Sequence, residues 1–399
     1  MLAGLMGCDL TVTNPGPVAD SFLDVEPAHA ALVGGMFRSM VEAQNWLAWT
    51  SSVIARELVA SGGIGEHGFT VRIEAGNLDP SQVGTEWSNA HRARWLAEDG
   101  ARRMRQAVGD ERFAAYGLGA QALVYAGYAN HFLGTLMCEA VIDGGAAEPS
   151  SVHLQHAEQQ FTEAIDIAGR ANNAAFQNAA RAGRALARAA LGKWADAVTD
   201  AQTLPRDFVF QLTRSTESDA VKNRFARGNQ NQPWRSHSAW STYFERYYTD
   251  TRDPRSPWST NPSFPRGDGR PVLWYFETKY GGPNITAPIK LASGHHMQLI
   301  IAEARLRAGD RQAAMDIINQ RRTALSLAPW TATTIAEAWT ALKLERFIEL
   351  WLEGRALADH RRYAAEQTPG PLPAEWNVSG RSLCFPISEA EREINPNIS

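Results

Sequence analysis

Several classes of protein are excluded by what this sequence of 399 residues lacks. Its 39 basic and 43 acidic residues nearly balance, so no excess of positive charge favours binding to nucleic acid. No apolar run reaches the roughly 18 residues that a helix needs to span a bilayer. Lysine is scarce, and most basic residues are arginine, which suits fixed ion pairs with carboxylates. We therefore expect a globular protein that binds no nucleic acid and contacts a membrane only through a tether.

Familiar catalytic and cofactor-binding motifs are also missing. The sequence contains no G-x-S-x-G, no Walker loop and no H-E-x-x-H. His153 and His156 stand one helical turn apart and His295 and His296 are adjacent, but neither pair brings a clear third metal ligand. We interpret these histidines as surface or packing residues, and we predict no enzyme activity, no cofactor and no metal site.

Cysteine occurs only three times, and two of the three stand in apolar surroundings. Cys138 lies in "YANHFLGTLMCEAV" and Cys384 in "SLCFPI", where a free cysteine usually acts as a small buried hydrophobic side chain. In an exported protein the two could instead form a disulfide, but the sequence alone does not place them close in space. We favour two buried thiols, and the disulfide stays open as the alternative.

Cys8 is different, because it follows Leu5-Met6-Gly7 in a pattern that resembles a bacterial lipobox. At a lipobox the chain is cleaved before a cysteine whose thiol is acylated, and two or more acyl chains anchor a protein stably. The alternative is a chance cysteine in a frayed N-terminus. We interpret residues 1–7 as the remnant of a signal peptide, although they lack a basic start, Cys8 as the lipidation site, and residues 8–27 as a lipidated tether.

Helical periodicity dominates the first half of the chain. Apolar residues recur at helical spacing over residues 28–60, 86–108, 111–137 and 150–171. We expect the second and third of these helices to form an antiparallel pair. The segment 174–204 predicts two shorter helices that break at Gly192.

A pattern related to the break at Gly192 recurs at Gly309. Each glycine follows an apolar helix, and an alanine that permits close packing stands five positions later, at Ala197 and Ala314. This pattern resembles the helix-turn-helix of tetratricopeptide repeats. The sequence therefore predicts an all-α fold with a tetratricopeptide-like helical-repeat scaffold.

Between these two patterns the composition changes. Residues 205–287 are rich in proline, glycine, asparagine and aromatic residues, and they are poor in helical periodicity. Long irregular segments of compact proteins are generally functional or disordered, and the aromatic content argues against disorder. We interpret this segment as a loop-rich recognition insert.

Three motifs near the C-terminus carry a resemblance to a known family. They are "LIIAEA" at 299–304, "ERFIELWLEGRALAD" at 345–359 and "PISEAEREINPN" at 386–397. In this order, and after a lipobox, they resemble the signatures of the SusD/RagB family of outer-membrane nutrient-uptake lipoproteins. The resemblance implies a single SusD-like domain over residues 28–399. Its parts are a helical scaffold at 28–204 and 288–365, the insert at 205–287 and a C-terminal closing segment at 366–399.

The resemblance also implies a function. We expect a lipid-anchored protein on the outer face of the outer membrane that binds a nutrient and delivers it to a SusC-like TonB-dependent transporter. An oligosaccharide is the favoured ligand, and a peptide is the alternative, because both kinds of site combine aromatic faces with a few polar groups. Two other classes stay open: a surface glycan hydrolase and a tetratricopeptide-like scaffold for envelope proteins.

A hydrolase would need two carboxylates that flank the scissile bond. Glu345, Glu349 and Glu353 recur every four residues along one helical face. Four arginines accompany them: Arg346, Arg355, Arg361 and Arg362. Since nearby guanidinium groups lower a carboxyl pKa and so remove the proton donor, we interpret these charges as structural ion pairs.

The candidate ligand-binding residues are aromatic side chains in polar surroundings. Trp234, Trp240 and Trp258 lie in the insert among proline, asparagine, serine and arginine residues, where a flat ring can face a sugar or an apolar peptide side chain. Phe69 and Arg72, in the turn-rich segment after the first helix, are weaker candidates. The alternative for each tryptophan is a loop anchor that packs onto the scaffold.

Overall fold

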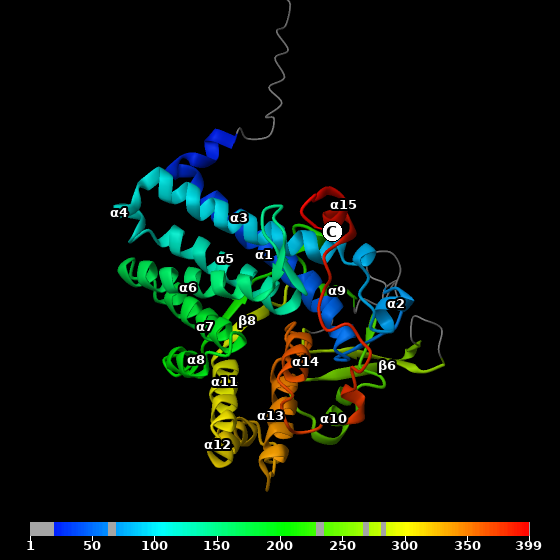
Figure 1. The fold of residues 1–399 in the computed structure, drawn as a ribbon. Helices are drawn as coiled ribbons and strands as arrows, with labels where there is room; N and C mark the ends of the chain where they lie inside the picture. The colour runs from blue at the N-terminus through cyan, green and yellow to red at the C-terminus, as the bar shows by residue number, and fades with distance from the viewer. Residues whose placement is uncertain (1–19, 63–68, 229–234, 266–270, 281–284, 399) are drawn as a thin grey trace, which may run out of the picture.

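The computed structural model describes residues 20–62, 69–228, 235–265, 271–280 and 285–398 (Figure 1). Helices are the main elements of the described residues, and the strands form four two-stranded antiparallel sheets. The prediction of an all-α fold is confirmed. Short 3-10 helices cover Asp20–Asp24, Glu26–Ala28, Pro80–Gln82, Asp219–Val221 and Ala374–Trp376.

Successive helices of the first half pack against one another. They are α1 (His29–Ile54), α3 (Gly84–Val108), α5 (Gly117–Leu136), α6 (Ser151–Arg170) and α7 (Ala174–Ala190). The short α4 (Asp110–Phe113) reverses the chain, so α3 and α5 form the expected pair. Gly127 of α5 and Gly183 of α7 both face the ring of Phe161, and a Cβ at either position would collide with that ring. The missing side chains let three helices approach closely.

Two further helix pairs match the glycine-centred patterns. The chain leaves α7, turns at Gly192 with φ +76° and enters α8 (Trp194–Ala201). It likewise leaves α11 (Gly294–Arg307), turns at Gly309 with φ +80° and enters α12 (Arg311–Ala324). Helix α8 packs against α11, so the two pairs stack although the insert separates them in sequence.

Two C-terminal helices complete the scaffold. Helix α13 (Ile335–Glu349) begins with a capping box between Thr334 and Glu337 and packs on α11 and α12. Helix α14 (Ala356–Ala365) packs against α1 and α5, and in Figure 1 it lies next to α13. These contacts join the last third of the chain to the first.

Two helix boundaries differ from the prediction. Helix α1 ends at Ile54, short of residue 60, because Arg56 adopts φ +61° and the backbone N–H of Glu57 turns back to the Ser52 carbonyl. The next residues form strand β1 (Val59–Ala60), whose apolar residues fit a strand as well as a helix. The expected helix over 111–137 is also interrupted, by a turn at 114–116 between α4 and α5.

The segment 205–287 contains short regular elements between its loops. Its helices are α9 (Arg224–Gly228) and α10 (Tyr243–Thr251), and its strands are β4 (Val209–Leu212), β5 (His237–Ser238), β6 (Trp258–Pro265) and β7 (Leu273–Glu277). Strand β4 pairs with β8 (Ile289–Ser293), β5 with β1, and β6 with β7. In Figure 1, α10 and β6 lie on the side of the molecule away from α6 and α7.

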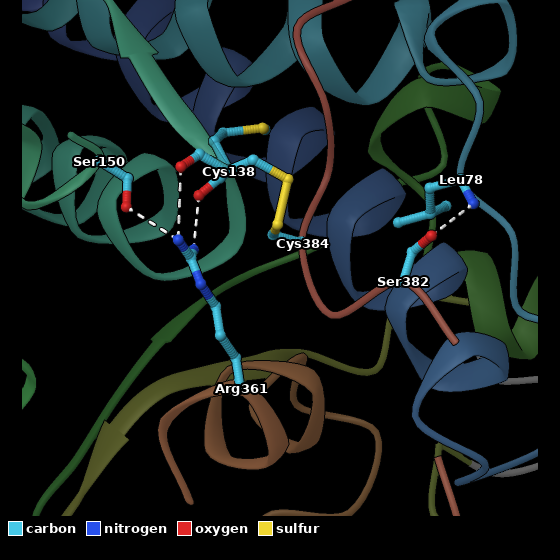
Figure 2. Close-up of a disulfide and its surroundings, with 7 residues drawn as sticks. Leu78, Cys138, Ser150, Arg361, Ser382 and Cys384 are labelled. Atoms are coloured by element: carbon cyan, nitrogen blue, oxygen red, sulfur yellow. Dashed lines mark hydrogen bonds between the residues drawn. A yellow bond between two sulfur atoms is a disulfide. The ribbon is translucent and has the colours of Figure 1, made fainter. Parts of the chain in front are cut away.

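The C-terminal segment crosses back over the scaffold and is covalently attached to it. The sulfur atoms of Cys138 and Cys384 are bonded, with their Cα atoms 5.0 Å apart (Figure 2). Beside the disulfide, Phe385 N–H donates to the Leu136 carbonyl and Cys138 N–H donates to the Phe385 carbonyl. The interpretation of two free buried thiols is therefore wrong, and the disulfide alternative is right. A sequence separation of 246 residues hides this contact from sequence patterns.

Three small elements complete the described chain. Helix α2 (Val71–Glu74) follows β1, the hairpin of β2 (Glu139–Val141) and β3 (Ala147–Pro149) follows α5, and α15 (Glu389–Ile394) ends the chain. The side-chain amides of Asn395 and Asn397 donate to the carbonyls of Gly145 and Gly144 in the β2–β3 turn. No helix in the described ranges is long and apolar enough to cross a membrane.

Candidate functional site

The structure describes four of the six residues predicted to bind a ligand or a lipid. Cys8 and Trp234 lie outside the described residues. Trp240, Trp258 and Phe69 gather around strands β5 and β7, whereas Arg72 stands on α2 and pairs with Asp79 at 3.0 Å. The candidate site is therefore built around β5, β7 and α10.

Trp258 begins strand β6 and is half-buried. Its indole N–H donates to the Phe244 carbonyl at 3.0 Å, and its ring lies 4.8 Å from the ring of Tyr275 and 5.6 Å from that of Tyr248. Because its single polar atom is already bonded to the backbone, Trp258 fits the loop-anchor interpretation, with part of its ring open to solvent.

Trp240 follows strand β5 at a tight turn in which Ser241 adopts φ +61°. The backbone N–H of Ala239 donates to the Tyr275 carbonyl, and the Tyr275 N–H approaches the Ser238 hydroxyl. Tyr275 therefore brings Trp240 and Trp258 to the same region, although they come from different elements. Trp240 is half-buried, so part of its surface is accessible.

An open hollow of about 420 Å³ begins at the residue after Trp240, and we call it the Trp240 hollow. Its lining residues are Ser241, Thr242, Glu245, Arg246, Thr249 and Glu375. Arg246 pairs with Glu375 at 2.9 Å, and a carboxylate oxygen of Glu245 accepts from the Ser241 N–H. The hollow thus gathers hydroxyl, carboxylate and guanidinium groups, and it begins one residue after Trp240 in the sequence.

Phe69 supports this region from the other side of β5. Its ring stacks on the ring of Trp49, with the two centroids 5.5 Å apart, and the centroid of the His237 ring lies 5.0 Å away. His237 belongs to β5 and precedes Trp240 by three residues. Phe69 packs against the hydrophobic core. Its contacts therefore hold β5 in place.

A buried network of charges fixes the segment that carries Trp258 onto helix α13. Arg255 lies among three carboxylates, with Asp253 at 2.7 Å, Glu345 at 2.5 Å and Glu349 at 3.0 Å. Arg322 also pairs with Glu345, and Arg321 with Glu349. The sequence predicts that these glutamates form structural ion pairs, but it does not identify Arg255 as a partner, because Arg255 is 90 residues from Glu345.

The electrostatics of this network favour ion pairing over acid catalysis. Burial alone would raise the pKa of Glu349, but the charges of Arg255 and Arg321 outweigh it and hold the pKa below its ordinary value. Glu345 and Glu349 are both almost wholly buried.

The prediction that Glu353 shares a helical face with these two acids is wrong, because α13 ends at Glu349 and Leu352 adopts φ +60° in the turn that follows. Glu353 pairs with Lys279 at 3.0 Å. These carboxylates therefore anchor the insert.

The histidine pairs noted in the sequence do not converge on a metal site. His153 is fully buried, and its Nδ1 atom lies 2.7 Å from Asn130 Oδ1. His296 is buried, whereas His295 and His156 are partly exposed. Within the described ranges, no cluster of three or more histidine, cysteine, aspartate or glutamate residues is arranged to hold a metal ion.

Sequence reasoning missed three residues that shape the site. Tyr248 and Tyr275 hold the ring of Trp258, and Arg246 lines the Trp240 hollow. The aromatic stretch "YFERYY" at 243–248 is a signal that could have pointed to Tyr248. Tyr275 stands in the aromatic run Trp274-Tyr275-Phe276, but its place beside Trp258 depends on the pairing of β6 with β7, which the sequence does not show.

Comparison with known proteins agrees with the C-terminal motifs. Residues 297–398, which include all three motifs, match the SusD family. No curated protein matches the sequence.

Solved structures with a similar fold cover nearly the whole chain. A SusD-like carbohydrate binding protein from Bacteroides vulgatus superposes with a TM-score of 0.67 at 14% identity, over 93% of this chain and 97% of that one. A SusD superfamily protein from Bacteroides thetaiotaomicron gives 0.68 at 12% identity, over 94% and 98%. A laminarin binding SusD-like protein gives 0.68 at 14% identity, also over 94% and 98%. At these identities the likeness shows a shared fold.

Proposed function

Because the chain belongs to the SusD/RagB family, we propose that it is a cell-surface lipoprotein that binds a glycan and passes it to a SusC-like TonB-dependent transporter. The observation that carries the glycan proposal is a polar hollow that begins at the residue after Trp240, which is itself partly exposed. Carbohydrate binding by a structural neighbour, and laminarin binding by another, support the ligand class.

The chemistry of the Trp240 hollow suits a sugar. A pyranose ring has an apolar C–H face that can lie on an indole, and hydroxyl groups at its edge that need hydrogen-bond partners. In our proposal Trp240 supplies the flat surface. Ser241, Glu245 and Arg246 supply donors and acceptors around it.

Attachment and delivery are further parts of the proposal. The lipobox-like Leu5-Met6-Gly7-Cys8 supports a lipid anchor, and family membership supports an outer-membrane location and a transporter partner. A protein that hands over intact ligand needs no catalytic group. The buried pairing of Glu345 and Glu349 is consistent with such a role.

Calorimetric titration with laminarin oligosaccharides, maltooligosaccharides and a casein peptide digest tests the ligand class and the site. We expect one glycan series to bind, and Trp240→Ala to weaken it about tenfold, roughly 1.4 kcal/mol, because the stacking surface is lost. Trp95→Ala is the matched control, since Trp95 is 50% exposed on α3 and does not line the Trp240 hollow.

Other outcomes identify the alternatives. If only peptides bind, the glycan proposal is wrong. If Trp95→Ala weakens binding and Trp240→Ala does not, the site lies on α3. Release of reducing sugar during the titration would indicate a hydrolase, and co-purification with soluble envelope proteins but no transporter would indicate a scaffold.

A further inference from the structure

A second cavity, of about 300 Å³, lies among the stacked helices and has no part in the proposed glycan site. Helices α5, α6, α7, α11 and α14 form most of its walls, α8 and α13 contribute one residue each, and we call it the α14 cavity. Ala365 and Glu366 at its rim are exposed, whereas His131, His296 and Arg355 in its lining are buried. The cavity therefore leads from solvent to buried polar side chains.

Four guanidinium groups and three carboxylates line the α14 cavity. All three carboxylates form ion pairs. Asp359 pairs with Arg346 and Arg362, and Glu303 pairs with Arg362 and Arg307. Glu366 pairs with Arg307. Two cations, Arg355 and Arg361, remain outside these ion pairs.

Arg355 and Arg361 form no ion pair with any residue that the structure describes. Arg355 donates to the Leu291 carbonyl at 2.6 Å, and Arg361 donates to the Met137 carbonyl at 2.6 Å and to the Ser150 hydroxyl (Figure 2). The hydrogen-bond partners of both guanidinium groups are neutral, and the carboxylates of Glu353 and Asp359 act on Arg355 only from beyond ion-pair distance. Burial lowers the pKa of both guanidinium groups, which reflects the cost of keeping these cations away from water.

His296 provides a separate indication of a missing partner. Its side chain is 3% exposed and lines the α14 cavity, yet neither ring nitrogen bonds to a described residue. Since this ring lines the cavity, a ligand atom in the cavity can bond to one of its nitrogens. Burial holds the His296 pKa well below its ordinary value, so the neutral ring has one donor and one acceptor nitrogen.

Part of the cavity wall is apolar. Leu154, Leu186 and Ile300 line it, and the ring of Trp194 lies toward its edge. The volume falls at the lower end of the range of about 300–1,000 Å³ for small-molecule sites. An inorganic anion would satisfy the arginines but leave this apolar wall unfilled.

We propose that the α14 cavity binds a small organic carboxylate. The carboxylate group lies against Arg355 and His296, and the apolar body lies along Leu154, Leu186 and Ile300. This site is independent of the glycan proposal, because it shares no residue with the Trp240 hollow.

Calorimetric titration in a buffer without organic acids tests this proposal with two matched pairs of probes, benzoate with benzyl alcohol and hexanoate with hexanol. We expect at least one carboxylate to bind at millimolar concentration or below, and about tenfold more tightly than its alcohol, because it alone forms charge-assisted hydrogen bonds. Equal affinity for acid and alcohol, or no binding of either acid, overturns the proposal. Because no probe is a sugar, failure here is distinguishable from failure at the Trp240 hollow.

Two substitutions locate the binding. Arg355→Gln should reduce carboxylate affinity at least about tenfold. Since Arg355 also holds the Leu291 carbonyl and the variant can misfold, Ala190→Phe is a second variant that fills the cavity without removing a side-chain hydrogen bond. Ala195→Phe, on the exposed surface of α8, is its control. Carboxylate binding that survives Ala190→Phe unchanged, in a protein with an unaltered melting temperature, overturns the proposed location.

Discussion

Among single residues, Glu349 shows how a carboxylate that resembles a catalytic acid serves the fold. It accepts from Arg255 and Arg321 and is 3% exposed. Although Glu349 lines a cavity of about 260 Å³, its charge is already compensated by these two arginines. Glu349 therefore connects the insert, helix α12 and helix α13.

We expect Glu349→Ala to lower the free energy of unfolding by about 1–3 kcal/mol, measured by chemical denaturation. The effect stays below the full cost of a stranded buried charge, because Arg255 keeps Asp253 and Glu345 as partners. Glu148→Ala, at an exposed position, is the control and should have little effect. Unchanged stability together with lost glycan binding would show instead that Glu349 contacts the ligand.

Glu57 predicts a pH dependence of stability. Its side chain is 1% exposed and accepts from Leu352 N–H at 2.9 Å, and burial raises its pKa from 4.5 to about 8. Between these values the folded protein holds a proton that the unfolded chain releases, so stability falls as pH rises, by up to about 1.4 kcal/mol per pH unit. The contribution is complete below pH 4.5 and is lost as pH passes about 8.

Glu57→Gln isolates this contribution, because glutamine imitates the protonated acid without titrating. Melting temperatures recorded at steps from pH 5 to pH 8 should fall more steeply for the wild type than for the variant. At the alkaline end the variant should be the more stable protein. Parallel curves would show that Glu57 does not titrate in this range.

For the secondary-structure elements, the sequence predicted helices well where apolar residues keep helical spacing over several turns. Helices α3, α6 and α7 were predicted because apolar residues repeat over several turns, and the break at Gly192 because glycine readily adopts its positive φ. The strands of the insert were missed, since β5 has two residues and β6 contains prolines and a register shift. The ion pairs of Arg255 were also missed, because local patterns carry no information about partners so distant in sequence.

The disulfide covalently joins the end of α5 to the C-terminal closing segment, a contact that local sequence patterns do not predict. It joins the residue after Met137, at the end of α5, to the closing segment. We expect Cys384→Ser, produced in an oxidising compartment, to lower the free energy of unfolding by about 2–5 kcal/mol, because the unfolded chain regains the freedom of a long loop. Chemical denaturation measures the difference.

Reductant provides the internal control for Cys384→Ser. Dithiothreitol should lower the wild-type melting temperature to about that of the variant and leave the variant unchanged. Equal melting temperatures for oxidised and reduced wild-type protein would mean that the hydrogen bonds between Phe385 and the end of α5 suffice to hold the segment.

At the scale of the whole molecule, we propose that a lipid anchor at Cys8 determines where the protein resides. We expect Cys8→Ala, expressed with a complete signal peptide, to move the protein from the membrane fraction to the soluble periplasmic fraction, because no acyl chain can be attached. Fractionation followed by immunoblotting measures this shift. Glycan affinity of the variant should equal that of the wild type, and retention in the membrane fraction would contradict the lipobox interpretation.

The covalent link between Cys138 and Cys384 also sets the order in which the molecule matures. A chain is synthesised from its N-terminus, so Cys138 emerges long before its partner, and the two sulfur atoms can join only when almost the whole chain has been made. Until then the first helices hold together through noncovalent contacts alone, among them the ion pair between Arg105 and Glu163. The bond therefore forms only after the closing segment has been made, and a chain that stops before Cys384 keeps Cys138 as an unpaired thiol.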